Sequence, residues 1–101
     1  MAKLIALYKQ PKDKKAFDKH YYGTHTPLVK KIPGLRETRV TKITGAPNGQ
    51  SEFYLLCEMV FDNEDALKHA MASKEMKACS KDLMTFAQDI VTMMIGEEAD
   101  A

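Results

Sequence analysis

Apolar and polar positions recur along the chain in a way that predicts four strands and three helices. Segments with alternating apolar or β-branched side chains predict strands over residues 3–9, 35–45, 52–62 and 89–96. Segments with apolar residues three or four apart, preceded by an Asp, Asn or Ser cap, predict helices over residues 14–22, 63–71 and 74–87. The order βαββαβ is that of an α+β, ferredoxin-like fold, in which helices cover one face of a four-stranded antiparallel sheet.

The stretch His-Tyr-Tyr-Gly-Thr-His-Thr-Pro-Leu, residues 20–28, predicts a bend after the first helix. Gly23 is expected to end that helix, while Thr26 and Pro27 suit the start of a short second one. In a continuous helix Phe17, Tyr21 and His25 would lie along one face. A break near Gly23 would release His25 from this face. The sequence therefore predicts that the bend aims His25 past the helix end and toward a cavity.

The first, third and fourth predicted strands carry apolar residues on both faces. Helices cover only one face of such a sheet, and a large bare apolar patch is rare on a monomer. Two sheets packed face to face would close into a barrel, so the sequence predicts a homodimer. The second predicted strand carries Glu37 and Arg39 on one face, which indicates that part of this face is exposed to water.

Length and charge narrow the class of protein. The 101 residues are enough for one domain, covering 1–101. Fifteen basic and fourteen acidic residues leave a net charge of +1. The chain therefore lacks the excess of basic residues that is typical of proteins that bind nucleic acid or an anionic membrane. The apolar run at the N-terminus is too short for a signal sequence or a membrane span. Cys57 and Cys79 form no spaced motif and are expected to be reduced and buried, which fits a cytoplasmic protein.

Several side chains are candidates for a pocket, which we expect between the sheet and the helices. A histidine can give or take a proton near neutral pH, so His25 is the candidate acid or base. Tyr21 or Tyr22 is the candidate donor to a carbonyl or enol oxygen, and their directions differ by about 100°, so one of the two should face the pocket. His25 could instead cap the bend by bonding to the backbone. The other expected pocket residues are Tyr8, Phe17, Leu28, Met59 and Met93.

No metal or cofactor site is predicted. His20 and His25 lie five residues apart across Gly23, which misses the four-residue step of a helical ligand pair. His20 is expected to be a solvated helix histidine. No glycine-rich phosphate loop is present, so a nicotinamide or a flavin would have no recognisable cradle.

Two sets of residues form a pattern that runs through most of the chain. The first set follows the order F-x3-Y-Y-x2-H-x-P-L and then P-G, and it comprises Phe17, Tyr21, Tyr22, His25, Pro27, Leu28, Pro33 and Gly34. The second set comprises Phe61, Asp62, Ser73, Asp82, Phe86 and Asp89. Together they resemble the EthD-like family, and the resemblance implies a homodimeric α+β barrel. The lysine-rich segment before Phe17 departs from the family pattern in the loop beside the expected pocket.

The resemblance implies a fold and leaves the reaction open, because one fold hosts many functions. EthD-like proteins are often described as reductases or oxidoreductases, and the wider set of dimeric barrels includes monooxygenases, isomerases and polyketide cyclases. Some of these relatives bind haem through a helix histidine, for which His69 is the counterpart here. The residues next to His69 in the sequence, Lys68 and Ala70, give no sign of a haem-binding pocket.

The function expected from these observations is the binding of a small hydrophobic carbonyl or phenolic metabolite by a homodimer. As an enzyme, the protein would carry out cofactor-free proton transfer, cyclisation, decarboxylation or O₂ chemistry on an acidic substrate, with His25 as acid or base and Tyr21 or Tyr22 holding the oxygen. The alternatives are a binding protein without turnover in a catabolic pathway and, less favoured by the residues, a haem-binding barrel.

Overall fold

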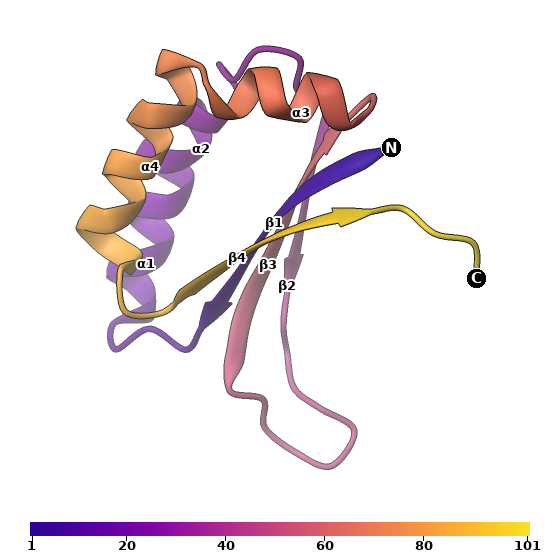
Figure 1. Cartoon of the computed structure of the whole chain (residues 1–101). Helices are drawn as coiled ribbons and strands as arrows, with labels where there is room; N and C mark the ends of the chain where they lie inside the picture. Colours follow the sequence, from indigo (N-terminus) through magenta and orange to yellow (C-terminus); the bar gives the residue numbers. More distant parts are fainter.

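A computed structural model describes all 101 residues and confirms the predicted order of elements (Figure 1). The elements are β1 (Ala2–Lys9), α1 (Lys14–His20), η1 (Tyr21–His25), α2 (Thr26–Val29), β2 (Glu37–Lys42), β3 (Phe53–Phe61), α3 (Glu64–Met71), α4 (Lys74–Ala87) and β4 (Val91–Glu97). The strands form one sheet in the order β2-β3-β1-β4, and every neighbouring pair is antiparallel. The fold is therefore α+β and ferredoxin-like, as the sequence predicts.

The predicted caps start the helices. Each cap side chain accepts a hydrogen bond from the backbone N–H three residues later, which satisfies a donor that the first helical turn would otherwise leave free. The capping residues are Asp13 for α1, Asn63 for α3 and Ser73 for α4. None of the helices has both the length and the apolar character needed to span a bilayer.

The predicted end of the helix at Gly23 is wrong. The chain stays helical from α1 through η1, a π-helical turn, into α2. In a regular helix the ring of Pro27 would crowd the carbonyl of Gly23, and a wider turn gives it room. The carbonyl of Tyr21 accepts both the backbone N–H and the hydroxyl of Thr26, the latter at 2.9 Å. The bend is thus a widened turn, and His25 stays on the helix instead of pointing past its end.

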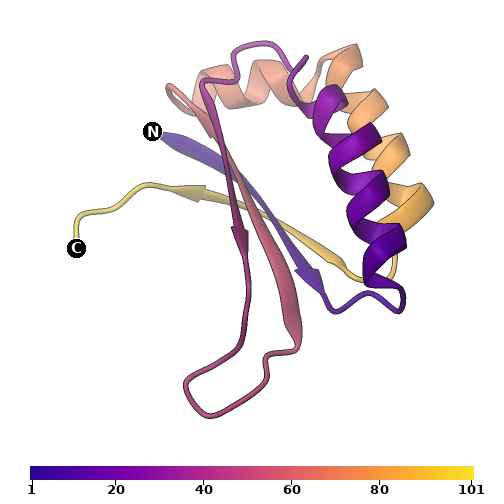
Figure 2. The same cartoon turned by 180° about the vertical axis from the view of Figure 1, so that it is seen from behind.

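The helices lie on one side of the sheet, and the other side is bare (Figures 1 and 2). Side chains of β1 alternate between these two faces, so that Leu4, Ala6 and Tyr8 are buried under the helices while Ile5 and Leu7 are half-buried on the open face. The core between sheet and helices includes both cysteines, which are buried and unpaired as predicted.

The open face of the sheet is apolar at its centre. Ile5 of β1 pairs with Met94 of β4, and Leu7 of β1 pairs with Leu56 of β3, so four apolar side chains lie together there. Met94 is 39% exposed in the single chain. This patch agrees with the prediction that the strands are apolar on both faces.

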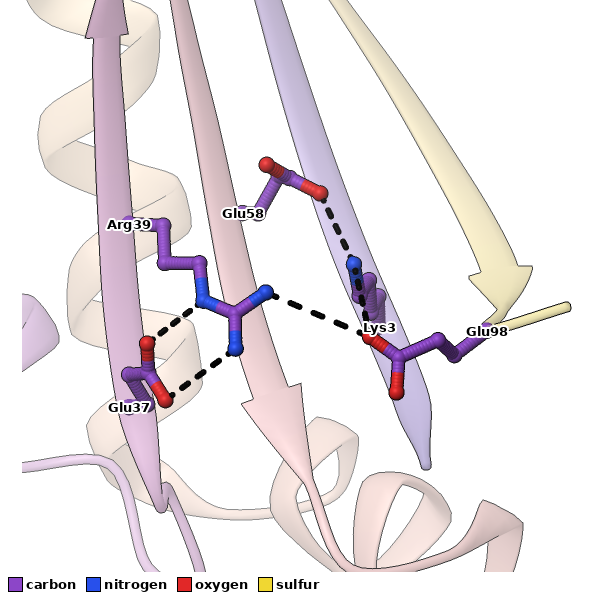
Figure 3. Close-up of polar contacts among 5 residues, drawn as sticks. All are labelled: Lys3, Glu37, Arg39, Glu58 and Glu98. Atoms are coloured by element: carbon purple, nitrogen blue, oxygen red, sulfur yellow. Dashed lines mark hydrogen bonds and ion pairs between the residues drawn. The ribbon is translucent and has the colours of Figure 1, made fainter. Parts of the chain in front are cut away.

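One end of the open face is charged, where the sequence predicts exposure to water at Glu37 and Arg39 but not the contribution of Lys3, Glu58 and Glu98. Figure 3 shows this cluster, with the helices behind the sheet. Lys3 Nζ lies 3.0 Å from Glu58 Oε2 and 3.6 Å from Glu98 Oε1. Arg39 pairs with Glu37, whose pKa the guanidinium holds below its usual value, and reaches Glu98 at 4.0 Å. The five side chains bridge all four strands because each strand, or the residue after it, supplies at least one.

Candidate functional site

His25 lies in the protein interior, at the junction of the π turn and α4. It is the one polar or charged residue among the buried set, with 5% of its surface exposed. Its Nδ1 is 3.0 Å from Oδ2 of Asp82 on α4. An ionised carboxylate only accepts hydrogen bonds, so Nδ1 of the neutral ring carries the proton and Nε2 keeps its lone pair. Nε2 makes no hydrogen bond to the protein and is free to act as a base.

His20 contacts the same carboxylate, which corrects the expectation that it is merely solvated. Its Nε2 lies 2.8 Å from Oδ1 of Asp82, while its side chain remains 33% exposed. The ring of Phe86 packs beside both imidazoles, with centroids 4.5 Å from that of His20 and 5.2 Å from that of His25. Asp82 therefore bridges two histidines, which Phe86 helps to hold in place.

Burial controls the protonation of His25. Loss of hydration lowers the pKa of His25, and this effect outweighs the opposing hydrogen bond and charge of Asp82. The ring is thus neutral at pH 7, in the state that can accept a proton.

An apolar cavity of about 30 Å³ lies between the sheet and the helices, and His25 forms part of its wall. Three of the five predicted pocket residues line it, namely Tyr8, Met59 and Met93. The other two do not. Phe17 is buried in an aromatic cluster beside the cavity, and Leu28 is half-buried against the core.

Of the two candidate tyrosines, Tyr21 faces the interior and Tyr22 faces outward. Tyr21 is 2% exposed and its ring centroid lies 5.9 Å from that of His25, whereas Tyr22 is 50% exposed. Tyr21 also packs edge-on against Tyr8, the tyrosine that lines the cavity. Burial raises the pKa of both Tyr8 and Tyr21, so their phenols stay protonated and can donate hydrogen bonds.

Asp82 is the site residue that the sequence reasoning did not assign. It lies three residues after Cys79 and four before Phe86, on the helical stripe that was expected to face the core. A carboxylate on such a stripe needs a buried partner, and this is the signal that could have pointed to it. Its partners come from a helix more than fifty residues earlier, so the sequence alone could not identify them.

The structure brings together no group of three or more His, Cys, Asp or Glu side chains that could hold a metal ion. His20 and His25 each direct a nitrogen at the carboxylate of Asp82 rather than at a common point. His69 is exposed near the end of α3, away from the cavity and its lining residues.

The lowered pKa of His25 predicts a pH-dependent stability. Between this pKa and the ordinary histidine value near 6.5, the unfolded chain binds more protons than the folded one, so the free energy of unfolding falls as pH decreases. We expect a lower urea midpoint at pH 5.5 than at pH 7.5, and this group should lower the free energy of unfolding by no more than about 1.4 kcal/mol per pH unit. His25→Gln should flatten the dependence, and His69→Gln should keep it. An unchanged pH profile in His25→Gln would refute this assignment.

Known proteins similar to this chain agree with the fold. The model of the EthD domain matches residues 9–90. A protein of Rhodococcus erythropolis, the uncharacterized 11.0 kDa protein in the thcB-thcC intergenic region, is 31% identical over 98 residues, covering 97% of this chain and 95% of that protein. The crystal structure of an EthD family protein from Bacillus halodurans is 57% identical, with a TM-score of 0.96 over 98% of this chain and 99% of that one.

A dimeric ferredoxin-like protein of unknown function from Thermobifida fusca shares the fold at 14% identity, with a TM-score of 0.69 over 96% of this chain and 90% of that one. The family match spans most of the chain, and it includes His20, His25 and Asp82. The chain therefore belongs to the EthD domain family.

Proposed function

We propose that this protein is a cofactor-independent enzyme that moves a proton on a small hydrophobic carbonyl or phenolic metabolite, with His25 as the base. The observation that carries the proposal is a buried, neutral imidazole whose Nδ1 is fixed by Asp82 while its ring lines an apolar cavity. A base whose proton-bearing nitrogen is oriented by a carboxylate is a recurring arrangement in enzymes that use general base catalysis.

The proposed step takes a proton from an acidic C–H or phenol O–H of the ligand to Nε2 of His25. The electron pair of the broken bond stays on the ligand as an enolate or phenolate. Asp82 stabilises the imidazolium that forms, because the charge-assisted hydrogen bond at 3.0 Å strengthens. The protonated phenol of Tyr8, which lines the cavity, is the donor for the ligand oxygen, and Tyr21 packs behind it.

A ligand needs more room than the cavity offers in the free chain. About 30 Å³ is the space of one water molecule. Met93 forms part of the wall and is 42% exposed, so it stands where the cavity meets the surface. Methionine side chains are unbranched and adapt readily to new shapes. We therefore assign Met93 as the movable wall through which the ligand is admitted.

The proposal includes a homodimer formed through the open face of the sheet. The apolar centre of that face supports it, since such patches mark interaction surfaces. The dimeric ferredoxin-like relative from Thermobifida fusca has the same fold, which adds further support. In such a dimer each subunit keeps its own cavity, because the cavity lies on the helix side of the sheet.

The test is α-proton exchange of phenylacetone, a small hydrophobic benzyl ketone, in D₂O, measured as loss of its α-proton NMR signal. Wild-type protein should accelerate the exchange, and His25→Gln should lose about 100-fold or more of that rate. His69→Gln removes an exposed histidine from α3 and should exchange at the wild-type rate. Binding of the ketone without acceleration in any of the three proteins would instead identify a non-catalytic binding protein.

A further inference from the structure

The two histidines share one carboxylate but face different surroundings. His25 lines the inner cavity, and its side chain is 7% exposed. His20 lines a separate outer groove of about 630 Å³ between the start of α1 and the end of α4, and its side chain is 33% exposed. The chain of contacts from His25 through Asp82 to His20 therefore joins the inner cavity to a surface that solvent reaches.

We propose that His20 is a positioning residue that transmits the protonation state of the outer groove through Asp82 to His25, and so sets the strength of His25 as a base. This proposal rests on the proposed function for its role in catalysis. The coupling itself is a property of the folded chain and can be measured without any substrate.

The coupling follows from the charges on the three groups. A single carboxylate has one negative charge with which to stabilise two imidazolium ions. When His20 takes up a proton, its Nε2–H at 2.8 Å engages Oδ1 by a charge-assisted bond, and its positive charge opposes a second one on His25. Protonation of either ring therefore disfavours protonation of the other, and the effect is reciprocal.

The cluster cannot easily avoid this competition by moving. The ring of Phe86 lies against both imidazoles, and Asp82 is itself only 13% exposed. His20 contacts both the carboxylate and the ring of Phe86, and His25 is held within the π turn. Proton uptake by a histidine is therefore expected to change the charge of this cluster while its side chains stay in place.

The other titratable groups near the cluster do not compete near neutral pH. Lys12, Asp13 and Asp89 line the outer groove together with His20. The buried groups beside the cluster are Tyr8 from β1, Tyr21 from η1, Cys57 from β3 and Cys79 from α4. Burial raises the pKa of each of them, that of Cys79 to about 11, so all four stay protonated and uncharged. Changes of charge within the cluster near neutrality therefore come from the two histidines.

The test is an NMR titration of the histidine ring signals between pH 4.5 and 8.5 in the whole protein. In His20→Gln the amide can still donate a hydrogen bond to Asp82 but carries no charge, so the His25 midpoint should shift upward from its wild-type position. His69→Gln removes a distant histidine and should leave the His25 curve unchanged. A His25 curve identical in His20→Gln and wild type, or no titration of His25 in either, would overturn the proposal.

Wild-type protein provides a second measurement should His20→Gln fail to fold. The His25 signals should then show two inflections, one of which coincides with the midpoint of His20. A single inflection unrelated to the His20 midpoint would contradict the coupling. Because these readouts need no ligand, a failed exchange assay with intact coupling would count against the proposed reaction and not against the role of His20.

Discussion

Replacing Phe17 with alanine is expected to lower the free energy of unfolding by about 3–5 kcal/mol. Phe17 is 4% exposed and lies at the centre of an aromatic cluster drawn from four other elements. Its ring centroid is 5.3 Å from that of Tyr8, 5.7 Å from Tyr21, 5.5 Å from Tyr54 and 5.5 Å from Phe86. These rings belong to β1, η1, β3 and α4, so this one side chain joins the first helix to the sheet and to α4.

The size of the effect comes from three losses. Truncation removes the apolar surface that Phe17 buries, leaves a cavity that rigid neighbouring rings cannot fill, and breaks four aromatic contacts. For a domain of this size the melting temperature should fall by about 12–20 °C, at roughly 4 °C per kcal/mol. Urea unfolding followed by circular dichroism, at equal protomer concentration for each variant, measures the change.

Tyr22→Ala is the matched control because it removes a ring of similar size from the same helical segment. Tyr22 is 50% exposed and contacts one aromatic ring, that of Tyr21. Its replacement should cost about 1 kcal/mol or less. Equal losses for the two variants would show that the Phe17 cluster does not hold the helices to the sheet.

Replacing Leu56 with arginine is expected to convert the proposed dimer into single chains. Leu56 lies at the apolar centre of the open face, paired with Leu7 and near Ile5 and Met94. In a two-fold dimer an arginine there enters the interface from both subunits, where it has no partner and loses its hydration. Sedimentation at about 50 μM should give the mass of one 11.4 kDa chain for the variant and of two chains for the wild type.

Met71→Arg is the control for added charge. Met71 is 42% exposed on α3, in the helical layer rather than on the open face, so this variant should remain dimeric. If wild-type protein sediments as one chain at high micromolar concentration, the homodimer proposal is wrong.

The charged cluster at Lys3 and Glu58 adds a further expectation for the proposed dimer. High salt screens these ion pairs and should therefore change the dissociation constant of the dimer.

Local signals were sufficient to predict the order of the strands and helices. The caps at Asp13, Asn63 and Ser73 act over three residues, and strand alternation acts over two, so both can be recognised without the fold. Gly23 shows where local signals fail. A glycine shortly before a proline favours a helix break, yet the segment stays helical through a widened turn in which Tyr21 and His25 are buried.

The site was predictable only in part, because its partners meet across the fold. His25 could be singled out by its chemistry, whereas Asp82 acquires its role from a helix that packs beside α4. Phe17 and Met93 illustrate the same limit for the cavity wall. Both are apolar residues on expected inner faces, but only the packing of side chains decides that Met93 lines the cavity and that Phe17 does not.

The π turn has a consequence for how this helix can evolve. A π turn accommodates one residue more than an α turn, and each residue advances a helix by about 100°. Loss of a single codon within Tyr21–His25 would restore ordinary winding and swing every side chain before the turn relative to those after it. His20 directly precedes the π turn and His25 is its last residue, so the contact of both with one carboxylate depends on the register of a single residue.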